Sequence, residues 1–375
     1  MKNRILIDCH KFDDKFEGIR TFIKGIYLSF YEINNDFDIF LAANDIENLK
    51  EEFKSLKGVH FVKLRFKNNI MRLLFEMPYI IYKYKISFAH FQYVVPPIKL
   101  CKYIVTCHDI LFNDYPQYFT LYYRYIKNFM YKNSIQRSEI ITTVSNYSKD
   151  RISQIFNVKK NRIIVTPNSV GEEFKQGINK QDSIEYIQTQ YNIQNYLIYV
   201  SRIEPRKNHQ MLLIAFIELE LWKSSYSLVF IGKNCFENKE LNKLYDNLDN
   251  NIKSNIHFLE DIPQFDLLHF YNASLLSVFP SLAEGFGIPP LESVSMQVPT
   301  LCSNQTAMSD FDFFGEQLFN PLDLNELKMK IRKQLQEGTQ NVKLIADKVH
   351  QKYSWKNSAK VIYKALINEN SNNRN

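Results

Sequence analysis

Two glutamates flank a glycine-rich turn and a double proline in the segment PSLAEGFGIPPLESVSMQVPT, residues 280–300. Glu284 comes before the glycines, and Glu292 follows the prolines. A carboxylate accepts hydrogen bonds at two oxygens, so each glutamate suits the neighbouring hydroxyls of a sugar ring or a ribose. Glycoside hydrolysis also uses two carboxyl groups, but they must face one bond from opposite sides. Two glutamates on one loop and the helix after it favour binding over hydrolysis.

A cationic loop is expected about eighty residues upstream. The segment YLIYVSRIEPRKNHQMLLIAF, residues 196–216, predicts a strand, a loop with Arg202 and Lys207, and a helix. Cations at the carboxyl end of a parallel strand, beside the positive end of a helix, favour an anionic ligand. Two solvated basic residues in a polar turn are the simpler alternative. Together, the two segments predict a diphosphate site with a sugar-binding and a ribose-binding glutamate.

Short apolar, β-rich runs alternate with longer amphipathic stretches, which is typical of parallel sheets covered by helices. The pattern stops at a polar stretch near residues 172–195 and then begins again. We therefore expect two doubly wound α/β domains, 1–180 and 181–352, which face a cleft lined by the carboxyl ends of their strands. A helix in 353–375 either crosses back to the first domain or packs on its own. Strands are expected at 4–8, 38–42, 59–64, 86–91, 103–109, 139–145, 162–168, 196–201, 226–232, 256–260, 275–280, 299–303 and 317–320.

The bulk composition agrees with a two-domain chain in a reducing compartment. The chain has 375 residues, of which 45% are hydrophobic, and this is too many for one ordinary core. Its five cysteines are scattered and never spaced as CxxC, which fits neither a disulfide framework nor a zinc site. No uncharged apolar run reaches the length of a membrane span, and the first residues lack a signal-peptide core. We expect a cytoplasmic protein, or one peripheral on the inner face of the plasma membrane.

Positive charge is concentrated in the first half of the chain. Residues 1–180 carry 28 Lys and Arg against 18 Asp and Glu, whereas 181–375 carry 19 against 22. Within the first half, 63–85 and 122–137 interleave basic residues with aromatic and aliphatic ones. Such faces suit an anionic headgroup layer, although ordinary amphipathic helices are an equal alternative. Nucleic acid is not expected, because no base-reading motif accompanies the charge.

The segments SRIEPRKNHQMLLIAF and PSLAEGFGIPPLESVSMQVPT resemble the donor-binding signatures of retaining glycosyltransferases with the GT-B fold, family 4. They are similar to the branch with a LEPRKN loop, whose members often build bacterial surface polysaccharides such as lipopolysaccharide and include many mannosyl- and rhamnosyltransferases. The resemblance extends along the chain. It includes IVTCHDILFNDYPQYF, ITTVSNYSKDRI, VTPNSVGEEF and YSWKNSAKVIYKAL.

The resemblance implies roles for the two segments. Arg202 and Lys207 would neutralise the donor's diphosphate and stabilise the departing nucleotide. Glu284 would bind hydroxyls of the transferred sugar, and Glu292 would bind the ribose. Three residues would supply main-chain amides near that sugar: Gly285, Phe286 and Gly287.

Three further positions receive roles from the resemblance. His108 would come from the first domain and touch the sugar or the incoming hydroxyl; a structural histidine at a strand end is its alternative. The main chain at Ile262 would contact the base. Gly18, in the segment EGIRTF, remains from a loop that carries a further glycine in the family.

The implied reaction transfers a sugar from a nucleotide diphosphate, with GDP-mannose slightly favoured, to a glycan acceptor, and it keeps the anomeric configuration. The acceptor would be lipid-linked, on a polyprenyl diphosphate, and neither a metal nor another cofactor is expected. A non-catalytic GT-B scaffold and a nucleotide-sugar epimerase remain as alternatives. Asp-x-Asp strings at 36–38 and 310–312 could suggest a manganese-dependent GT-A enzyme, but we interpret both as solvated turn acids.

Overall fold

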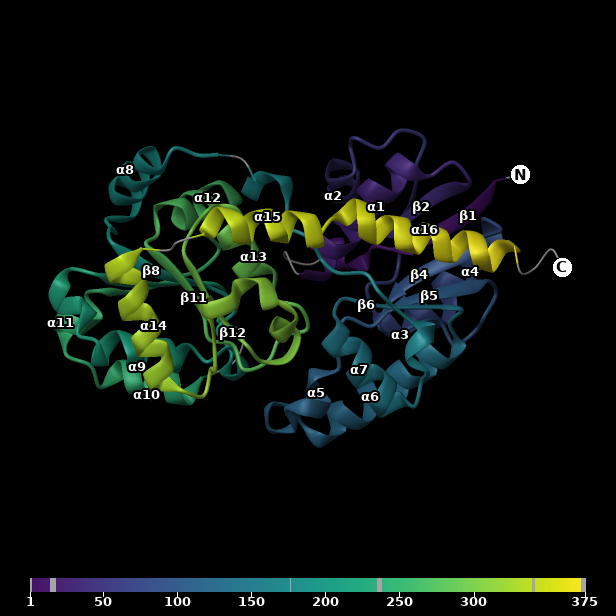
Figure 1. Ribbon diagram of the computed structural model, residues 1–375. Coiled ribbons are helices and arrows are strands. Elements are labelled where there is room, and N and C mark those ends of the chain that lie inside the picture. Colours follow the sequence, from purple (N-terminus) through teal and green to yellow (C-terminus); the bar gives the residue numbers. More distant parts are fainter. Residues whose placement is uncertain (1, 14–17, 176, 235–237, 339–340, 372–375) are drawn as a thin grey trace. The chain divides into compact units, whose positions relative to one another are not determined.

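The computed structural model describes residues 2–13, 18–175, 177–234, 238–338 and 341–371 (Figure 1). The chain forms two compact units, Met1–Ser169 with Ser354–Asn375, and Val170–Tyr353. The first boundary therefore lies eleven residues before the predicted position at 180, and the last helix belongs to the first unit. Each unit is an α/β domain with one parallel sheet, so the predicted fold class is confirmed.

The first unit contains a seven-stranded parallel sheet in the order β3-β2-β1-β4-β5-β6-β7. Its central strands are apolar and almost fully buried, as expected for a sheet with helices on both faces. The strands are β1 (Asn3–Asp8), β2 (Phe37–Ala43), β3 (His60–Lys63), β4 (Phe88–Gln92), β5 (Lys102–Thr106), β6 (Ile140–Thr143) and β7 (Ile163–Val165).

Helices connect these strands, and several begin at a side-chain cap. Thr120 accepts a hydrogen bond from the Tyr123 amide, and Ser145 accepts one from the Ser148 amide. A helical run at 69–83 contains a π-helical turn, Arg72–Glu76, between α3 and α4. The α-helices are α1 (Gly18–Ile33), α2 (Ile46–Glu52), α3 (Asn69–Met71), α4 (Met77–Lys83), α5 (Leu111–Asp114), α6 (Leu121–Arg137), α7 (Asn146–Phe156) and α16 (Trp355–Ser371).

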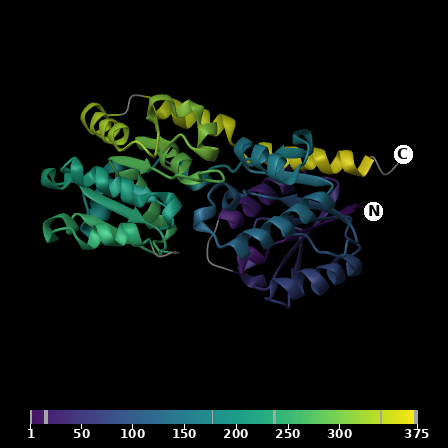
Figure 2. The same ribbon diagram turned by 90° about the horizontal axis from the view of Figure 1, so that it is seen from below.

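The helix α16 returns from the end of the chain to pack beside α1 (Figures 1 and 2). The rings of Phe22 and Trp355 meet edge-on, with their centroids 6.3 Å apart. A Cβ atom at Gly25 would lie 2.2 Å from the Trp355 indole, so only glycine allows this contact. Ser358 donates a hydrogen bond to the Pro167 carbonyl and fastens the start of the helix.

The second unit contains a six-stranded parallel sheet in the order β10-β9-β8-β11-β12-β13. Its strands are β8 (Tyr196–Val200), β9 (Ser227–Ile231), β10 (Ile256–Leu259), β11 (Leu276–Phe279), β12 (Thr300–Ser303) and β13 (Leu318–Phe319). Its α-helices are α8 (Lys180–Tyr191), α9 (His209–Glu218), α10 (Lys239–Asp246), α11 (Asn250–Lys253), α12 (Gln264–Ala273), α13 (Ile288–Ser295), α14 (Leu324–Glu337) and α15 (Val342–Lys352).

Strand order reverses between β1 and β4 in the first sheet and between β8 and β11 in the second. At such a switch point the two neighbouring loops leave the carboxyl edge in opposite directions and leave room for a ligand. The predicted cationic loop follows β8, and the predicted glutamate loop follows β11. The fold therefore brings the two segments to the switch point of the second unit. In the described part of the chain, no helix combines the length and apolarity that a membrane span needs.

Candidate donor site

The loop after β8 is shaped by a close approach of two backbones. The Ser201 amide donates to the Ile231 carbonyl, and the Ile203 amide donates to the Lys233 carbonyl. Gly232 has φ +150°, and a Cβ atom there would lie 2.0 Å from the Ser201 carbonyl oxygen. Only a glycine at this position lets the loop that carries the predicted cations leave the sheet where it does.

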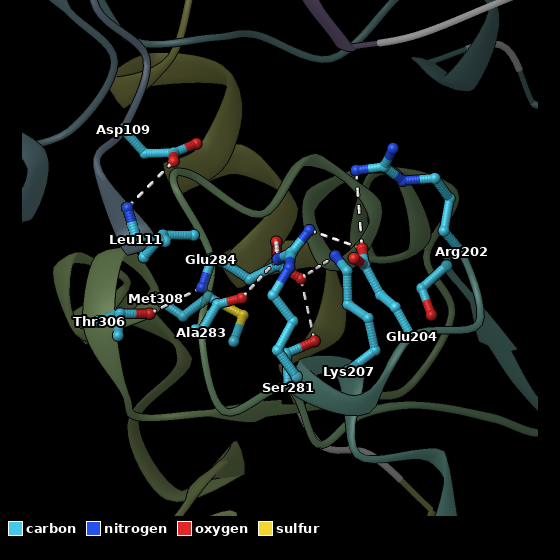
Figure 3. A network of polar contacts seen from close by, with 12 residues as sticks. Asp109, Leu111, Arg202, Glu204, Lys207, Ser281, Ala283, Glu284, Thr306 and Met308 are labelled. Atoms are coloured by element: carbon cyan, nitrogen blue, oxygen red, sulfur yellow. Dashed lines mark hydrogen bonds and ion pairs between the residues drawn. The ribbon is translucent and has the colours of Figure 1, made fainter. Parts of the chain in front are cut away.

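Lys207 and Glu284 form an ion pair across the switch point (Figure 3). Lys207 ends a short 3-10 turn before α9 and is buried, at 8% exposure. Glu284 lies in the loop after β11, where its Oε1 also accepts from the Ser281 hydroxyl at 2.9 Å. The Tyr199 hydroxyl lies 2.8 Å from both the Lys207 carbonyl oxygen and Ser281 Oγ. It therefore connects the backbone of Lys207 to the serine that donates to Glu284. The structure thus brings together two of the predicted site residues.

The two partners hold each other in their charged forms. Burial lowers the pKa of the Lys207 ammonium, while the Glu284 carboxylate opposes this shift. Burial alone would raise the pKa of Glu284, but the charges of Lys207 and Arg206 outweigh it and lower that pKa below its usual value. Glu284 is therefore a carboxylate at neutral pH, and it favours the charged form of Lys207 beside it at the carboxyl edge of the sheet.

Arg206 is a central residue that sequence reasoning missed. Its guanidinium donates to Glu204 Oε1 at 2.6 Å and to the Ala283 carbonyl at 2.7 Å, and it lies 3.6 Å from Glu284 Oε2. The Leu282 amide also donates to the Arg206 carbonyl at 2.8 Å. Arg206 therefore ties the loop after β8 to the loop after β11. The string EPRK was the available signal, because it places a second cation and an acid beside Lys207.

Arg202 lies in the predicted loop after β8 but outside the contact between Lys207 and Glu284. Its side chain is half exposed, and its guanidinium lies 3.6 Å from Glu204 Oε1, on the side away from Glu284 in Figure 3. Glu204 is buried at 6% exposure and is shared between Arg202 and Arg206. The inner cation beside Glu284 is thus Arg206, and Arg202 lies at the outer edge of the same network.

The loop after β11, which carries Glu284, is fixed by a backbone hydrogen bond and by the packing of Phe286. The Glu284 amide donates to Thr306 Oγ1 at 2.9 Å, which fixes the direction of the loop (Figure 3). The Phe286 ring is buried against Phe311 and Tyr353, with centroids 5.7 and 5.3 Å away. This packing gives Phe286 a structural role besides the predicted amide contact.

Gly287 has φ +95° and occupies the N-cap position of α13. The two prolines follow in the first turn, where their missing N–H groups cost nothing. Gly285 lies between Glu284 and Phe286 at partial exposure. The segment therefore forms the expected loop and helix start.

Glu292 lies in the second turn of α13 and has an unusual protonation state. Burial raises the pKa of its carboxyl to about 8, and the nearby Glu173 carboxylate adds to this shift. The Tyr271 hydroxyl donates to Glu292 Oε2 at a distance of 3.4 Å. Glu292 is therefore largely protonated at neutral pH.

His108 follows β5 in the first unit and is buried at 7% exposure. Its Nε2 lies 2.8 Å from Gln92 Oε1, and its ring meets Phe22 edge-on at 4.9 Å. Burial lowers the pKa of His108 to about 3, so its imidazole is neutral. A neutral histidine with one nitrogen fixed by Gln92 can exchange hydrogen bonds with a hydroxyl, but it is a weak base.

The remaining predicted positions lie at loop ends. Gly18 is the first residue of α1, and no atom comes within 4 Å of an added Cβ there. Ile262 follows β10 and comes two residues before α12, at partial exposure. Both positions stand at carboxyl-edge connections of their own sheets.

Aspartates of the two Asp-x-Asp strings, at 36–38 and 310–312, bind other side chains of the protein. Asp36 accepts from the Tyr363 hydroxyl, and Asp312 pairs with Lys352 at 3.1 Å. Among the residues that the structure describes, no cluster of three or more His, Cys, Asp or Glu could hold a metal ion.

Comparison with known families agrees with the division of the chain. Residues 180–346 match the family described as Glycosyl transferases group 1, and residues 34–174 match Glycosyltransferase Family 4. The O-antigen chain mannosyltransferase B of Escherichia coli is 29% identical over 70% of this chain and 69% of its own length. The serotype-specific mannosyltransferase WbdA of Escherichia coli is 27% identical over 69% of this chain, which spans only 32% of that relative.

Solved structures share the fold at low sequence identity. The Anabaena protein HepE, crystallised with UDP-glucose, has a TM-score of 0.74 at 15% identity, with 97% of this chain and 99% of that chain covered. Sucrose-phosphate synthase from Thermosynechococcus elongatus has a TM-score of 0.75 at 13% identity, with 99% and 100% covered. With its strand order, its two parallel-sheet domains and both family matches, this chain belongs to family 4 of the glycosyltransferases with the GT-B fold.

Proposed function

We propose that this protein transfers a hexose from a nucleotide diphosphate to a glycan acceptor with retention of the anomeric configuration. Mannose from GDP-mannose is the favoured donor sugar, because the curated relatives are mannosyltransferases of O-antigen synthesis. The product would belong to a bacterial surface polysaccharide. The observation that carries the proposal is the buried Lys207–Glu284 pair at the switch point of the second unit, with Arg206 beside it.

This cluster suits the charge changes of sugar transfer. Breaking the bond between sugar and phosphate leaves an oxocarbenium-like ring and an additional negative charge on the diphosphate. A cation that is already fixed and desolvated stabilises that charge most strongly in the transition state. Lys207 and Arg202 would contact the diphosphate, while Arg206 would hold the two loops at a constant separation.

Glu284 would change partners when the donor binds. In the present structure it neutralises Lys207 and accepts from Ser281. A bound diphosphate offers Lys207 a stronger anionic partner, and Glu284 is then available for hydroxyls of the transferred sugar. Glu292 would accept from the ribose hydroxyls, while the main chain at Ile262 would contact the base.

The acceptor hydroxyl would attack from the face that the nucleotide leaves, and a phosphate oxygen would take its proton. His108 would orient the sugar or the incoming hydroxyl through hydrogen bonds, because its low pKa makes it a poor base. The positive charge that a divalent ion supplies in other sugar transferases would come from Lys207, the arginines and the start of α9. The reaction is therefore expected to proceed without a metal.

The acceptor is assigned to the first unit, which carries the excess positive charge of the chain. A glycan on a polyprenyl diphosphate fits this charge, and peripheral contact with an anionic membrane would bring the enzyme to it. A non-catalytic scaffold or a nucleotide-sugar epimerase would use the same fold, but the buried Lys207–Glu284 pair gives a scaffold no evident benefit.

Binding and product analysis test this proposal. Thermal shift with GDP, UDP and dTDP should reveal stabilisation by one nucleotide, and Lys207→Ala should weaken it. With the matching nucleotide sugar, NMR of the product should show the donor's anomeric configuration, and EDTA should leave the rate unchanged. An inverted product or a rate restored only by manganese would refute the mechanism. Stabilisation by no nucleotide would favour the scaffold.

A further inference from the structure

The first unit contains an apolar groove that is lined by none of the residues assigned to the donor. It has a volume of about 410 Å³ and is lined by residues of the helical run 69–83, of α6 and of the loop after β4. Most of its lining is aliphatic or aromatic. The residues that matter here are Ile70, Leu73, Leu74, Val95, Phe129 and Met130.

Large apolar side chains remain exposed at the rim of this groove. Ile70 is 65% exposed and Phe129 is 72% exposed, although both line the groove. The same two helical segments expose further rings, which are Phe75, Tyr79, Tyr82, Tyr122 and Tyr125. An unusual amount of exposed apolar surface is a mark of binding sites.

The segment 69–83, which forms one side of the groove, is anchored by two buried charged residues. Arg72 is buried, and its Nη1 lies 3.2 Å from Asp8 Oδ1 at the end of β1. Glu76 is also buried and accepts from the Arg65 and Phe66 amides at 2.6 and 3.1 Å. The π-helical turn between these two anchors brings the adjacent Leu73 and Leu74 to the same groove. Such turns occur frequently at functional sites.

The surroundings of the groove are strongly cationic. α6 carries four basic residues and no acidic one. Residues 63–85 carry six basic residues, of which Arg72 is buried and paired with Asp8 while the other five are exposed. Their one acidic residue, Glu76, is buried against backbone amides. The occupant should therefore combine a hydrocarbon part with negative charge.

We propose that this groove binds the first isoprenoid units of a lipid phosphate, with the phosphate held by the basic side chains around it. The inference deepens the proposed function, since it assigns a site to the lipid carrier of the acceptor. The groove volume of about 410 Å³ is more than ten times the roughly 30 Å³ that one water molecule occupies in the liquid, so several isoprenoid carbon atoms fit into it. A bilayer surface would need exposed rings and charges but no groove. A protein partner would be expected to meet acidic as well as basic groups at the rim.

Titration calorimetry of the full chain, below the concentrations at which the ligands form micelles, tests the groove. The ligands are farnesyl phosphate, geranyl phosphate and inorganic phosphate. Each buried methylene should tighten binding by up to about fourfold, so farnesyl phosphate should bind at least tenfold more tightly than geranyl phosphate. Ile70→Asp and Phe129→Asp should each weaken farnesyl phosphate binding at least tenfold. Both side chains are largely exposed, so these variants should fold.

Leu121→Asp is the matched control, because Leu121 is 68% exposed on α6 and does not line the groove. It should retain the binding of farnesyl phosphate within about threefold. Vesicles of phosphatidylglycerol without isoprenoid provide a second comparison. Equal affinity for the two isoprenoid phosphates, or equal losses in all three variants, would overturn the proposal. Loss of vesicle binding without loss of farnesyl phosphate binding would instead identify a bilayer contact.

A nucleotide titration separates this inference from the proposed function. The groove variants should bind GDP, or whichever nucleotide stabilises the wild type, with unchanged affinity. If nucleotide binds and farnesyl phosphate does not, the groove assignment fails while the donor site stands. If farnesyl phosphate binds and no nucleotide does, the proposed transferase activity fails while the groove stands.

Discussion

Lys207 and Glu284 lie 77 residues apart in the chain and form a buried ion pair that joins the loops after β8 and β11. Each residue alone would be costly to bury, and each offsets part of the other's cost. If the proposed function holds, an incoming diphosphate would replace Glu284 as the anionic partner of Lys207.

Replacing Lys207 by alanine should remove one fixed contact to the departing diphosphate. We expect a loss of about 2–4 kcal/mol in transition-state stabilisation, measured as kcat/KM with the matching nucleotide sugar. Lys223→Ala is the control, because Lys223 is a half-exposed lysine paired with a neighbour three residues away. Turnover of Lys207→Ala within a few-fold of wild type would contradict the assigned role.

Arg206→Ala should lower stability more than Arg202→Ala. The change leaves Glu204 buried with only the longer Arg202 contact, and removing one partner of a buried pair costs about 3–5 kcal/mol. Thermal unfolding should show a midpoint several degrees lower for Arg206→Ala and nearly unchanged for Arg202→Ala. Adding Glu204→Gln to Arg206→Ala should restore part of the loss. Equal midpoints for the two single variants would exclude the bracing role of Arg206.

Glu292 should make stability depend on pH in an unusual direction. Its pKa is raised from 4.5 to about 8 in the folded protein, so between these values the folded state holds a proton that the unfolded state has lost. Stability should therefore fall as pH rises from about 4.5 to 8, by up to about 1.4 kcal/mol per pH unit. Urea unfolding of wild type and Glu292→Gln across this range measures the effect. A slope that persists in Glu292→Gln would assign it to another group.

His108→Ala should reduce kcat without moving the pH profile. Its pKa of about 3, caused by burial, places its titration below the range in which activity is measured. Initial rates of wild type and variant between pH 5.5 and 8 should therefore give parallel profiles. An inflection near pH 6.5 that disappears in His108→Ala would show that the ring titrates during turnover and acts as a base.

Gly232→Ala should disturb the cationic loop from the neighbouring strand end. Its Cβ would lie 2.0 Å from the Ser201 carbonyl oxygen. Relieving this clash would require the backbone at residue 232 or at Ser201 to move, which costs stability. Gly58→Ala is a suitable control, because Gly58 has φ +73° but no atom within 4 Å of an added Cβ. Thermal unfolding should show a larger decrease for Gly232→Ala than for Gly58→Ala, which should cost only about 1 kcal/mol.

The sheets were predictable because buried parallel strands are encoded as short apolar runs. The strand at 38–42 was placed within one residue of β2, whereas 103–109 ran past the end of β5. The predicted strand included His108, which lies two residues beyond the end of β5 and is not part of the sheet. Apolar periodicity marks burial, and it does not mark the residue at which hydrogen bonding between strands stops.

The loops that form the site could be predicted from the sequence, but most contacts between their side chains could not. Lys207 and Glu284 were both selected from their loop context, and the structure pairs them. The contact between Arg206 and Glu284 was not predicted, because it depends on the 3-10 turn at Pro205–Lys207 and on the directions of the side chains. The groove of the first unit was also beyond prediction, since it joins segments from three separate parts of the chain.

The return of α16 to the first unit has a consequence for biosynthesis. The apolar face of α1 around Phe22 and Gly25 receives Trp355 only after all of 170–353 has been translated. Until then a nascent first unit carries an uncovered hydrophobic surface, which is a target for chaperones. Ribosome stalling before residue 354 should leave this unit sensitive to protease, even though its seven strands have already emerged.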